Sequence, residues 1–335
     1  MENSSTKLLN AGDIIISARG TVGALAVLKK KMAFNQSCYG INNIPDISDS
    51  DYLYYLTKDS INNFQQIAHG GVFDAITRDT FSHIDILLPP LPEQRAIAGV
   101  LSSLDDKIDL LHRQNKTLEG MAEAFWRKMF VEEADPGWKK GKLGDYLQIQ
   151  GGNAFKSIDF KDTGEIEIIK ITNISGGLVD IVNTQFVDRK IVDTLDRKFK
   201  ITTGSILIAM TGAEIGKIGI VEKTEKEIWL NQRVGMLQEI KKYGNLLGFF
   251  ALNSDEGQEH ILSSATGSAQ ANISSTGIED FEMPIVPDLI LDGFGIVVKP
   301  FFDKICFNLG QIRTLSRMRD TLLPKVISGE VRVKL

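Results

Sequence analysis

The stretch that decides the fold is residues 97–129, IAGVLSSLDDKIDLLHRQNKTLEGMAEAFWRKM. Its apolar positions advance in alternating steps of four and three, through Ile97, Leu101, Leu104, Ile108, Leu111, Asn115, Leu118, Ala122, Phe125 and Met129. That spacing is the heptad seam of a helix that packs against another helix, sustained for roughly five repeats. A polar Asn115 on the seam favours one register and one partner, at some cost in stability. The sequence therefore predicts a long helix with a helical partner.

The partner is a second helical run, in which Lys304-Ile305 matches Lys107-Ile108 at an offset of 197 residues (304 − 107 = 197). Its seam positions are Phe301, Ile305, Asn308, Ile312, Leu315, Leu322 and Val326. This run is less regular, because Arg319 occupies a seam position and Pro300 should break or kink the helix near its start. We expect the two helices to form an antiparallel coiled coil; the alternative is two amphipathic helices that each lie on their own domain.

The match between the two halves extends upstream of the helices. The paired stretches are residues 12–20 with 204–212, Asn35-Gln36 with Asn231-Gln232, and Gly70-Gly71 with Gly267-Ser268. A period this long is not that of a solenoid. It indicates two copies of a domain plus a helix, and hence pseudo-two-fold character with two equivalent binding sites.

The two copies differ in length, because residues 142–192 have no counterpart before Met1. The first domain is therefore expected to begin partway through the repeat. Another chain could supply the first part, the domain could be incomplete, or the gene could be truncated.

Local patterns predict mixed domains. Short apolar runs bounded by turn residues predict strands at residues 14–18, 24–28, 166–171, 205–210 and 218–221, and residues 51–64 have helical spacing. The predicted fold class is α+β, with two mixed α/β domains, the first incomplete at its N-terminus, and two long paired helices. We divide the chain into a partial domain (1–90), a first helical spacer (91–135), a second domain (136–287), and a second spacer with the C-terminal tail (288–335).

Composition narrows the class of protein. Of the 335 residues 43% are hydrophobic, and no apolar run approaches the ~20 residues that span a bilayer. From the lack of such a run we expect no membrane association. Cys38 and Cys306 are too few for a disulfide framework, which favours a reducing cytoplasm. Residues 1–88 carry 7 Lys and Arg against 9 Asp and Glu, and residues 142–286 carry 15 against 20. Neither half has the basic excess of a nonspecific nucleic-acid binder, so any DNA contact must be local.

Motifs for catalysis are lacking. The run TGAEIGKI (211–218) resembles a phosphate-binding loop, but it is one residue short between its glycines and has Ile218 where Ser or Thr would bind magnesium. The four histidines are scattered, which argues against a metal cluster or a catalytic triad. We therefore predict no catalytic residue, no metal site and no cofactor on this chain.

Hydrogen-bonding side chains in glycine-rich turns are the best candidates for a binding site. Such side chains read base edges and phosphates. For any single residue ordinary turn chemistry is the better explanation, and it is the set repeated in both halves that favours a binding role. The DNA-binding candidates are Arg19, Thr21, Asn35, Gln36, Gly70, Gly71, Asn153, Lys156, Lys170, Asn173, Thr211, Lys217, Asn231, Gln232, Arg233, Gly267, Ser268 and Gln270. The candidates for the helix-pair or partner interface are Leu104, Ile108, Leu111, Asn115, Leu118, Phe125, Ile305, Ile312, Leu315 and Leu322.

Three further stretches resemble a known family. They are RDTLLPKVISGEVRV (319–333), LPPLPEQR (88–95) and WKKGKLGD (138–145), of which the first is the strongest. With them the chain resembles, over essentially its whole length, the specificity (S) subunit of Type I restriction–modification systems.

The resemblance implies a function for the doubled pattern. It implies two target-recognition domains that each read half of a split DNA sequence, and helices that hold them apart and dock methyltransferase (M) subunits. It also implies a restriction (R) subunit in a complex that uses S-adenosylmethionine, ATP and Mg²⁺, none of them bound by this chain. The incomplete first domain leaves two alternatives open, self-association that completes it, or a truncated or recombination-reservoir form that acts only as a scaffold or half-site reader.

Overall fold

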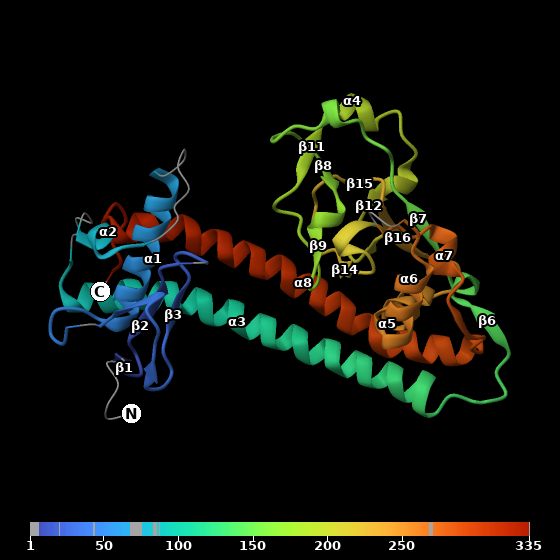
Figure 1. Ribbon diagram of the computed structural model, residues 1–335, viewed down its shortest axis with the longest axis horizontal. Helices are drawn as coiled ribbons and strands as arrows, with labels where there is room; N and C mark the ends of the chain where they lie inside the picture. The colour runs from blue at the N-terminus through green and yellow to red at the C-terminus, as the bar shows by residue number, and fades with distance from the viewer. Residues whose placement is uncertain are drawn as a thin grey trace. The chain divides into compact units, whose positions relative to one another are not determined.

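The chain folds into two compact units, which we describe separately (Figure 1). Unit 1 comprises residues 1–110 and 313–335, and unit 2 comprises residues 111–312. The computed structural model describes residues 7–334 except 20, 43, 68–75, 83–85, 87 and 268–270. Two long helices, α3 (Leu91–Arg127) and α8 (Asp288–Ile327), contribute residues to both units.

Unit 2 contains two principal sheets. The six-stranded sheet has the order β7 (Leu147–Gly151), β16 (Val234–Glu239), β13 (Ile206–Ala209), β14 (Ile218–Ile220), β10 (Gly177–Val179) and β9 (Ile174–Ser175). The four-stranded sheet has the order β11 (Gln185–Val187), β8 (Ile166–Ile169), β15 (Ile228–Leu230) and β12 (Lys200–Ile201). β6 (Lys140–Lys142) and β17 (Glu282–Pro284) form a separate two-stranded antiparallel sheet. The short helices are α4 (Arg189–Val192), α5 (Gly244–Asn253), α6 (Asp255–Ser264) and α7 (Ser275–Glu279).

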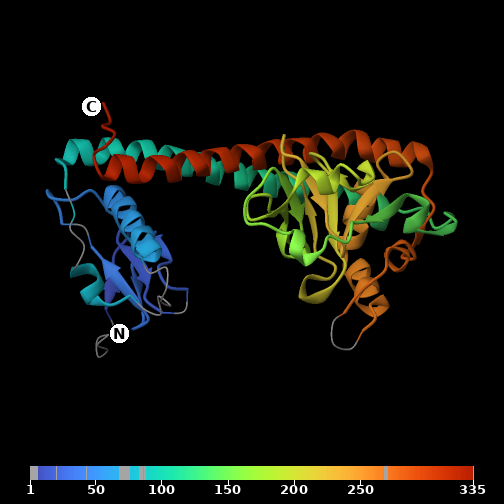
Figure 2. The same ribbon diagram turned by 90° about the horizontal axis from the view of Figure 1, so that it is seen from above.

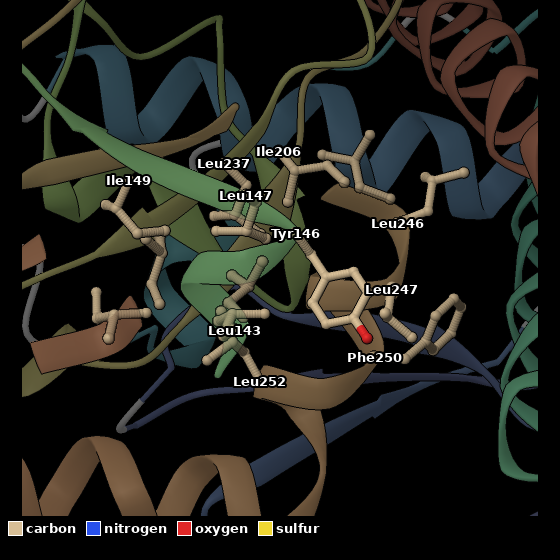
Figure 3. Packing of buried hydrophobic residues seen from close by; sticks show 14 of the residues in the cluster. Leu143, Tyr146, Leu147, Ile149, Ile206, Leu237, Leu246, Leu247, Phe250 and Leu252 are labelled. Carbon is tan, nitrogen blue, oxygen red and sulfur yellow. The ribbon is translucent and has the colours of Figure 1, made fainter. Parts of the chain in front are cut away.

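The six-stranded sheet is buried on both faces. On β13, Ile206 and Ile208 pack in a core shared with α5–α8, whereas Leu207 and Ala209 pack in a core shared with the four-stranded sheet. Because side chains alternate along a strand, burial of both faces gives a continuous apolar run in the sequence. Figure 3 shows Tyr146 at the centre of the first core. Its hydroxyl donates to the Pro284 carbonyl at 2.7 Å, which ties the core to the chain leading into α8.

The predicted break at Pro300 is absent, because helix α8 continues through this residue. Phe294, Val298 and Phe302 are buried in the core of unit 2 and hold this part of the helix in place. A proline has no N–H to donate to the carbonyl of the residue four positions earlier. Here that residue is Ile296, whose side chain is exposed. Tertiary packing thus outweighs the cost of the proline.

The described residues of unit 1 form two small sheets and four helical segments, two of which are the ends of α3 and α8. One sheet has the order β3 (Leu25–Val27), β2 (Ile14–Ser17) and β5 (Cys38–Ile41), and the other joins β1 (Leu8–Leu9) and β4 (Met32–Ala33). Figure 2 shows α1 (Ser50–Ile67), the blue helix, alongside these strands, and α2 is residues Arg78–Ser82. Tyr52 and Leu56 of α1 pack with Leu101 of α3 and Leu323 of α8.

The two long helices are paired within each unit. In unit 1 Asp105 on α3 contacts Arg319 on α8, and in unit 2 Asn115 contacts Asn308. Further along unit 2, Phe125 stacks on Phe294. Residues later in α3 thus contact residues earlier in α8. The helices are therefore antiparallel, as predicted. None of the helices among the described residues is both long and apolar enough to span a membrane.

The sequence repeat is reproduced in the backbone hydrogen bonds. Gly12 donates to Leu28 at 2.8 Å in unit 1, and Gly204 donates to Val221 at 2.9 Å in unit 2. Both glycines have a φ in the left-handed region, +88° and +80°. The strands β2, β3 and β5 of unit 1 pair in the same way as β13, β14 and β16 of unit 2, all antiparallel. The predicted mixed α/β fold with a long helix pair is confirmed.

Candidate nucleic-acid interface

The site in unit 2 is centred on the turn from Asn231 to Arg233, which joins β15 to β16. The chain after β7 clamps this turn, because Asn153 receives a hydrogen bond from the Gln232 amide at 2.7 Å and donates to the Leu230 carbonyl at 2.9 Å. Gly152 makes the close approach possible, since an added Cβ would lie 2.1 Å from the Asn231 carbonyl oxygen. The turn is thus fixed by backbone contacts, while Gln232 and Arg233 remain exposed.

Arg233 has an unusual backbone. Its φ of +72° lies in the left-handed region, which costs a non-glycine residue about 1 kcal/mol or more. Its carbonyl accepts the Met210 amide at 2.9 Å, and its guanidinium donates to the Asn272 side chain at 2.9 Å. A guanidinium has five N–H donors, and this bond uses one. The strained turn therefore holds a cationic donor at the surface.

Two further segments meet beside Arg233. The Thr211 hydroxyl and the Gly212 amide both donate to the Ala271 carbonyl, at 3.1 and 2.9 Å. Thr266 and Asn272 exchange backbone hydrogen bonds at 2.8 and 2.9 Å. Thr211 is buried, so its hydroxyl fastens these segments together beneath the surface.

Lys170 and Asn173 belong to the same end of the four-stranded sheet. β8 and β15 run parallel with Ile169 opposite Leu230, so Lys170 and the Asn231 turn leave the sheet side by side. Asn173 is buried and accepts from the Lys170 amide at 2.9 Å, which shapes the loop. The Lys170 ammonium lies 3.6 Å from the centre of the Phe160 ring and contacts Gln185; its burial lowers the pKa of this ammonium.

The cations near this site differ in their partners. Lys217 is paired with Glu214 on the loop after β13. Arg189, which lies 3.2 Å from both Glu165 and Glu227, is at the opposite end of β8 and β15. Within the described part of the chain no carboxylate lies in ion-pairing range of Arg233. Arg233 is therefore placed to meet an anionic or hydrogen-bonding ligand.

Unit 1 repeats the framework of the site with different side chains. The Ala18 amide donates to the Ser37 carbonyl at 2.8 Å and the Ile76 amide to the Ala18 carbonyl at 3.0 Å, matching the bonds of Met210 to Arg233 and of Ile273 to Met210 at 2.9 and 3.0 Å. Ser37 thus stands in the place of Arg233, and it lacks the positive φ. Arg19 stands in the place of Thr211 and is exposed, as are Thr21, Asn35 and Gln36.

The predicted DNA-binding residues are therefore only partly gathered. The contacts above join Asn153, Lys170, Asn173, Thr211, Asn231, Gln232 and Arg233 in unit 2. Lys156 is exposed nearby along the chain, and Gly267 follows Thr266. Gly70, Gly71, Ser268 and Gln270 lie outside the described residues.

Known proteins share this architecture and sequence. The family described as Type I restriction modification DNA specificity domain matches residues 1–120 and 136–290. The chain belongs to this family. The MjaIX specificity subunit of Methanocaldococcus jannaschii is 28% identical over 100% of this chain and 81% of its own length, and the MjaVIII subunit of the same organism is 23% identical over 98% and 81%. The crystal structure of a Type I S subunit from M. genitalium covers 96% of this chain, which in turn covers 84% of that structure, with a TM-score of 0.60 and 19% identity.

In this member of the specificity-domain family, all the predicted helix-interface residues are buried or half-buried. Ile108, Leu111, Asn115 and Ile305 are buried, while Leu104, Leu118, Phe125, Ile312, Leu315 and Leu322 are half-buried. Asn308 donates to the side-chain oxygens of Asn115 at 2.8 Å and Gln114 at 2.9 Å. A buried polar contact of this kind favours one register of the helix pair.

Two residues of this family member's site were missed by sequence reasoning. Phe160 and Gln185 surround the Lys170 ammonium, but they lie 10 and 15 positions away in the chain (170 − 160 and 185 − 170) and on other segments. No local pattern connects them to Lys170, because only the tertiary fold brings a loop and strand β11 to the end of β8.

Proposed function

We propose that this chain is the noncatalytic, cytoplasmic DNA-recognition and scaffold subunit of a Type I restriction–modification complex. The observation that carries the proposal is the repeated site framework, in which the Ala18, Ser37 and Ile76 hydrogen bonds of unit 1 match those of unit 2. Two copies of one framework in one chain suit a target made of two half-sites. Membership of the DNA specificity family supports the same conclusion.

Residues 136–287 are the second recognition domain in this proposal, and residues 1–90 are the first. Arg233 and Gln232 would read base edges in one half-site, and Arg19, Asn35 and Gln36 in the other. Arginine pairs with guanine and glutamine with adenine through two hydrogen bonds each, in the major groove. Lys156, Lys170 and Lys217 would contact phosphates, while Thr211, Asn173 and Asn153 hold the loops in place.

The helical spacers, residues 91–135 and 288–335, would dock the methyltransferase subunits. Several large apolar side chains of α8 are exposed in unit 2, including Leu289, Ile296 and Phe307. Exposed apolar side chains of this size on one helix favour a protein partner. The complete assembly would include the restriction subunit and would use S-adenosylmethionine, ATP and Mg²⁺ on those other subunits. An acidic chain can then bind DNA, because its partners neutralise part of the phosphate charge.

A second candidate function is a half-site reader or interaction scaffold. It is favoured by unit 1, where Ser37 replaces the arginine of the turn and several strand residues are exposed. In that case only unit 2 would impose a sequence on the complex.

Methylation mapping distinguishes these functions. The chain is coexpressed with its methyltransferase subunits in a host without other adenine methylation, and methylated adenines are located by sequencing. A split motif with two defined halves supports two readers, and a motif with one defined half supports the half-site reader. The absence of any motif-dependent methylation would contradict both.

A further inference from the structure

The Arg233 side chain is held by a residue from a distant part of unit 2. Its Nη1 atom donates to the side-chain oxygen of Asn272 at 2.9 Å. Asn272 lies 39 residues further along the chain (272 − 233 = 39), in the connection between α6 and α7. A guanidinium has donors but no acceptor, so its partner must be the oxygen of the Asn272 amide and not the nitrogen. The contact therefore joins two segments that are remote in sequence through one defined pair of atoms.

The backbones on both sides of this contact are fastened to Met210, the residue that follows β13. The Met210 amide donates to the Arg233 carbonyl at 2.9 Å, and the Met210 carbonyl accepts from the Ile273 amide at 3.0 Å. Thr266 and Asn272 add two backbone hydrogen bonds, at 2.8 and 2.9 Å. Because the two backbones are fixed to one strand end, the Asn272 oxygen has its position before any ligand binds.

The contact leaves a defined part of the guanidinium available. Nη1 is engaged, so Nε and Nη2, whose N–H bonds lie side by side, remain as a fork of two donors. Arg233 is exposed, and among the described residues Asn272 is the one side chain hydrogen-bonded to it. A side chain that is already held in place loses less rotamer entropy when it binds. The arrangement thus presents a fork with a fixed orientation.

We propose that Asn272 is a positioning residue that determines which base the Arg233 turn reads, because it presents the Nε and Nη2 fork to the O6 and N7 atoms of a guanine. The inference rests on the proposed DNA recognition by unit 2, and it adds the base and the residue that selects it. Guanine has two acceptors on its major-groove edge that match an arginine fork. Without the Asn272 bond the guanidinium can turn single N–H groups to other acceptors. Discrimination between bases then falls while the positive charge stays.

The backbone around Asn272 makes the side chain a clean target for substitution. The bonds between Thr266 and Asn272, and from Ile273 to Met210, use main-chain atoms alone. A change of the Asn272 side chain should therefore leave this segment in place. Asn272→Ala removes the bond to Arg233, and Asn272→Asp keeps an acceptor oxygen for it.

The first measurement uses the full-length chain without DNA or partners. The Nε–H signal of Arg233 in a ¹⁵N NMR spectrum, identified by its loss in Arg233→Lys, reports the order of the guanidinium. We expect an order parameter above about 0.6 in the unchanged chain and in Asn272→Asp, and below about 0.6 in Asn272→Ala. This result does not depend on what unit 2 binds.

The second measurement uses the chain assembled with its methyltransferase subunits. Methylation rates are compared on DNA duplexes in which each base pair of the half-site assigned to unit 2 is changed in turn. We expect Arg233→Ala to lose about tenfold or more of the discrimination at one G·C pair, and Asn272→Ala about threefold or more at that same pair and none elsewhere. Asn272→Asp should keep the discrimination, although its negative charge weakens binding to every sequence alike. Asn253→Ala, at an exposed asparagine at the end of α5, is the control and should change neither measurement.

Four results would overturn the inference. They are an Arg233 order parameter that Asn272→Ala leaves unchanged, a base pair other than G·C at the position that Arg233 reads, full discrimination in Asn272→Ala at that position, and equal losses in Asn272→Ala and Asn272→Asp. The last result would make the Asn272 amide nitrogen a reader in its own right. A motif that Arg233→Ala leaves unchanged would contradict the proposed function of unit 2, and this inference with it, even if the NMR result is as expected.

Discussion

The turn after β4 in unit 1 and the turn after β15 in unit 2 share their hydrogen bonds but not their chemistry. The unit 2 turn ends in Arg233, strained and exposed, whereas the unit 1 turn ends in Ser37 with ordinary backbone geometry. Unit 2 adds a clamp from Gly152 and Asn153 that has no counterpart among the described residues of unit 1. The two units therefore share the backbone framework of the candidate site and differ in the side chain that the turn presents.

The largest expected effect comes from breaking the clamp that distinguishes unit 2. Gly152→Val would place side-chain atoms against the Asn231 carbonyl, so we expect unit 2 to lose about 3 kcal/mol or more of stability. Urea denaturation with hydrogen exchange resolved by unit measures this, and unit 1 should keep its protection. Gly120→Ala, in open space on α3, is the control and should be neutral or stabilising by about 1 kcal/mol. Equal loss of protection in both units would mean that the units are not separate.

The second largest effect is expected from removing the contact between α3 and α8 in unit 1. Arg319 pairs with Asp105 at 2.5 Å, and Asp105 also accepts from the Tyr55 hydroxyl at 2.7 Å. This contact holds the phenol neutral, and burial together with Asp105 raises the pKa of Tyr55 above its usual range. We expect Arg319→Met to cost about 2 kcal/mol, the scale of a hydrogen bond to a charged group. Thermal unfolding of unit 1 measures the change, and Arg317→Met, at an exposed neighbouring position, should leave it within about 0.5 kcal/mol.

The corresponding contact of unit 2 is uncharged and should be weaker. Asn115→Ala leaves the Asn308 amide with Gln114 as its remaining partner, so we expect a loss of about 1–2 kcal/mol. The double change Asn115→Leu with Asn308→Leu should restore stability, because replacing both members of a buried polar pair by apolar groups is nearly neutral. It should also relax the register of the helices, which disulfide cross-linking of added cysteines can detect. A double variant less stable than the single one would contradict this account.

The smallest expected effect is a difference between the labelling rates of the two cysteines. Burial raises the pKa of the Cys306 thiol to about 12, so at pH 8 almost none of it is thiolate. Cys38 of unit 1 is half-buried, and we expect iodoacetamide to label it first. As pH rises from 8 to 10, labelling of Cys306 should keep increasing, because its deprotonation remains incomplete. Faster labelling of Cys306 than of Cys38 would place it outside the core.

Much of the fold was predictable from sequence because it rests on periodic burial. The heptad seam through Asn115 predicted the helix pair, and the continuous apolar run at residues 205–210 predicted β13, whose two faces are both buried. The predicted break at Pro300 was wrong, since the local cost of a proline is outweighed by burial of Phe294, Val298 and Phe302. That outcome depends on α5–α7, which no local pattern could reveal.

The candidate site was less predictable. Residue type and glycine-rich turns selected Asn231, Gln232 and Arg233, and their position in a turn follows from the flanking strands. The structure adds that Asn173 and Thr211 are buried and that Arg233 adopts a strained conformation. These properties arise from contacts between segments that are distant in sequence, such as the bond from Arg233 to Asn272.

The measurement that tests the central claim most directly is the methylation motif produced by an Arg233→Ala chain with its methyltransferase subunits. We predict that one half of the split motif relaxes at one position, by the ~1–3 kcal/mol that a two-bond arginine contact contributes, while the other half is unchanged. Lys190→Ala, which removes an exposed cation on α4, should leave the whole motif intact. An unchanged motif with Arg233→Ala, or equal relaxation of both halves, would contradict the assignment of one reader to each unit.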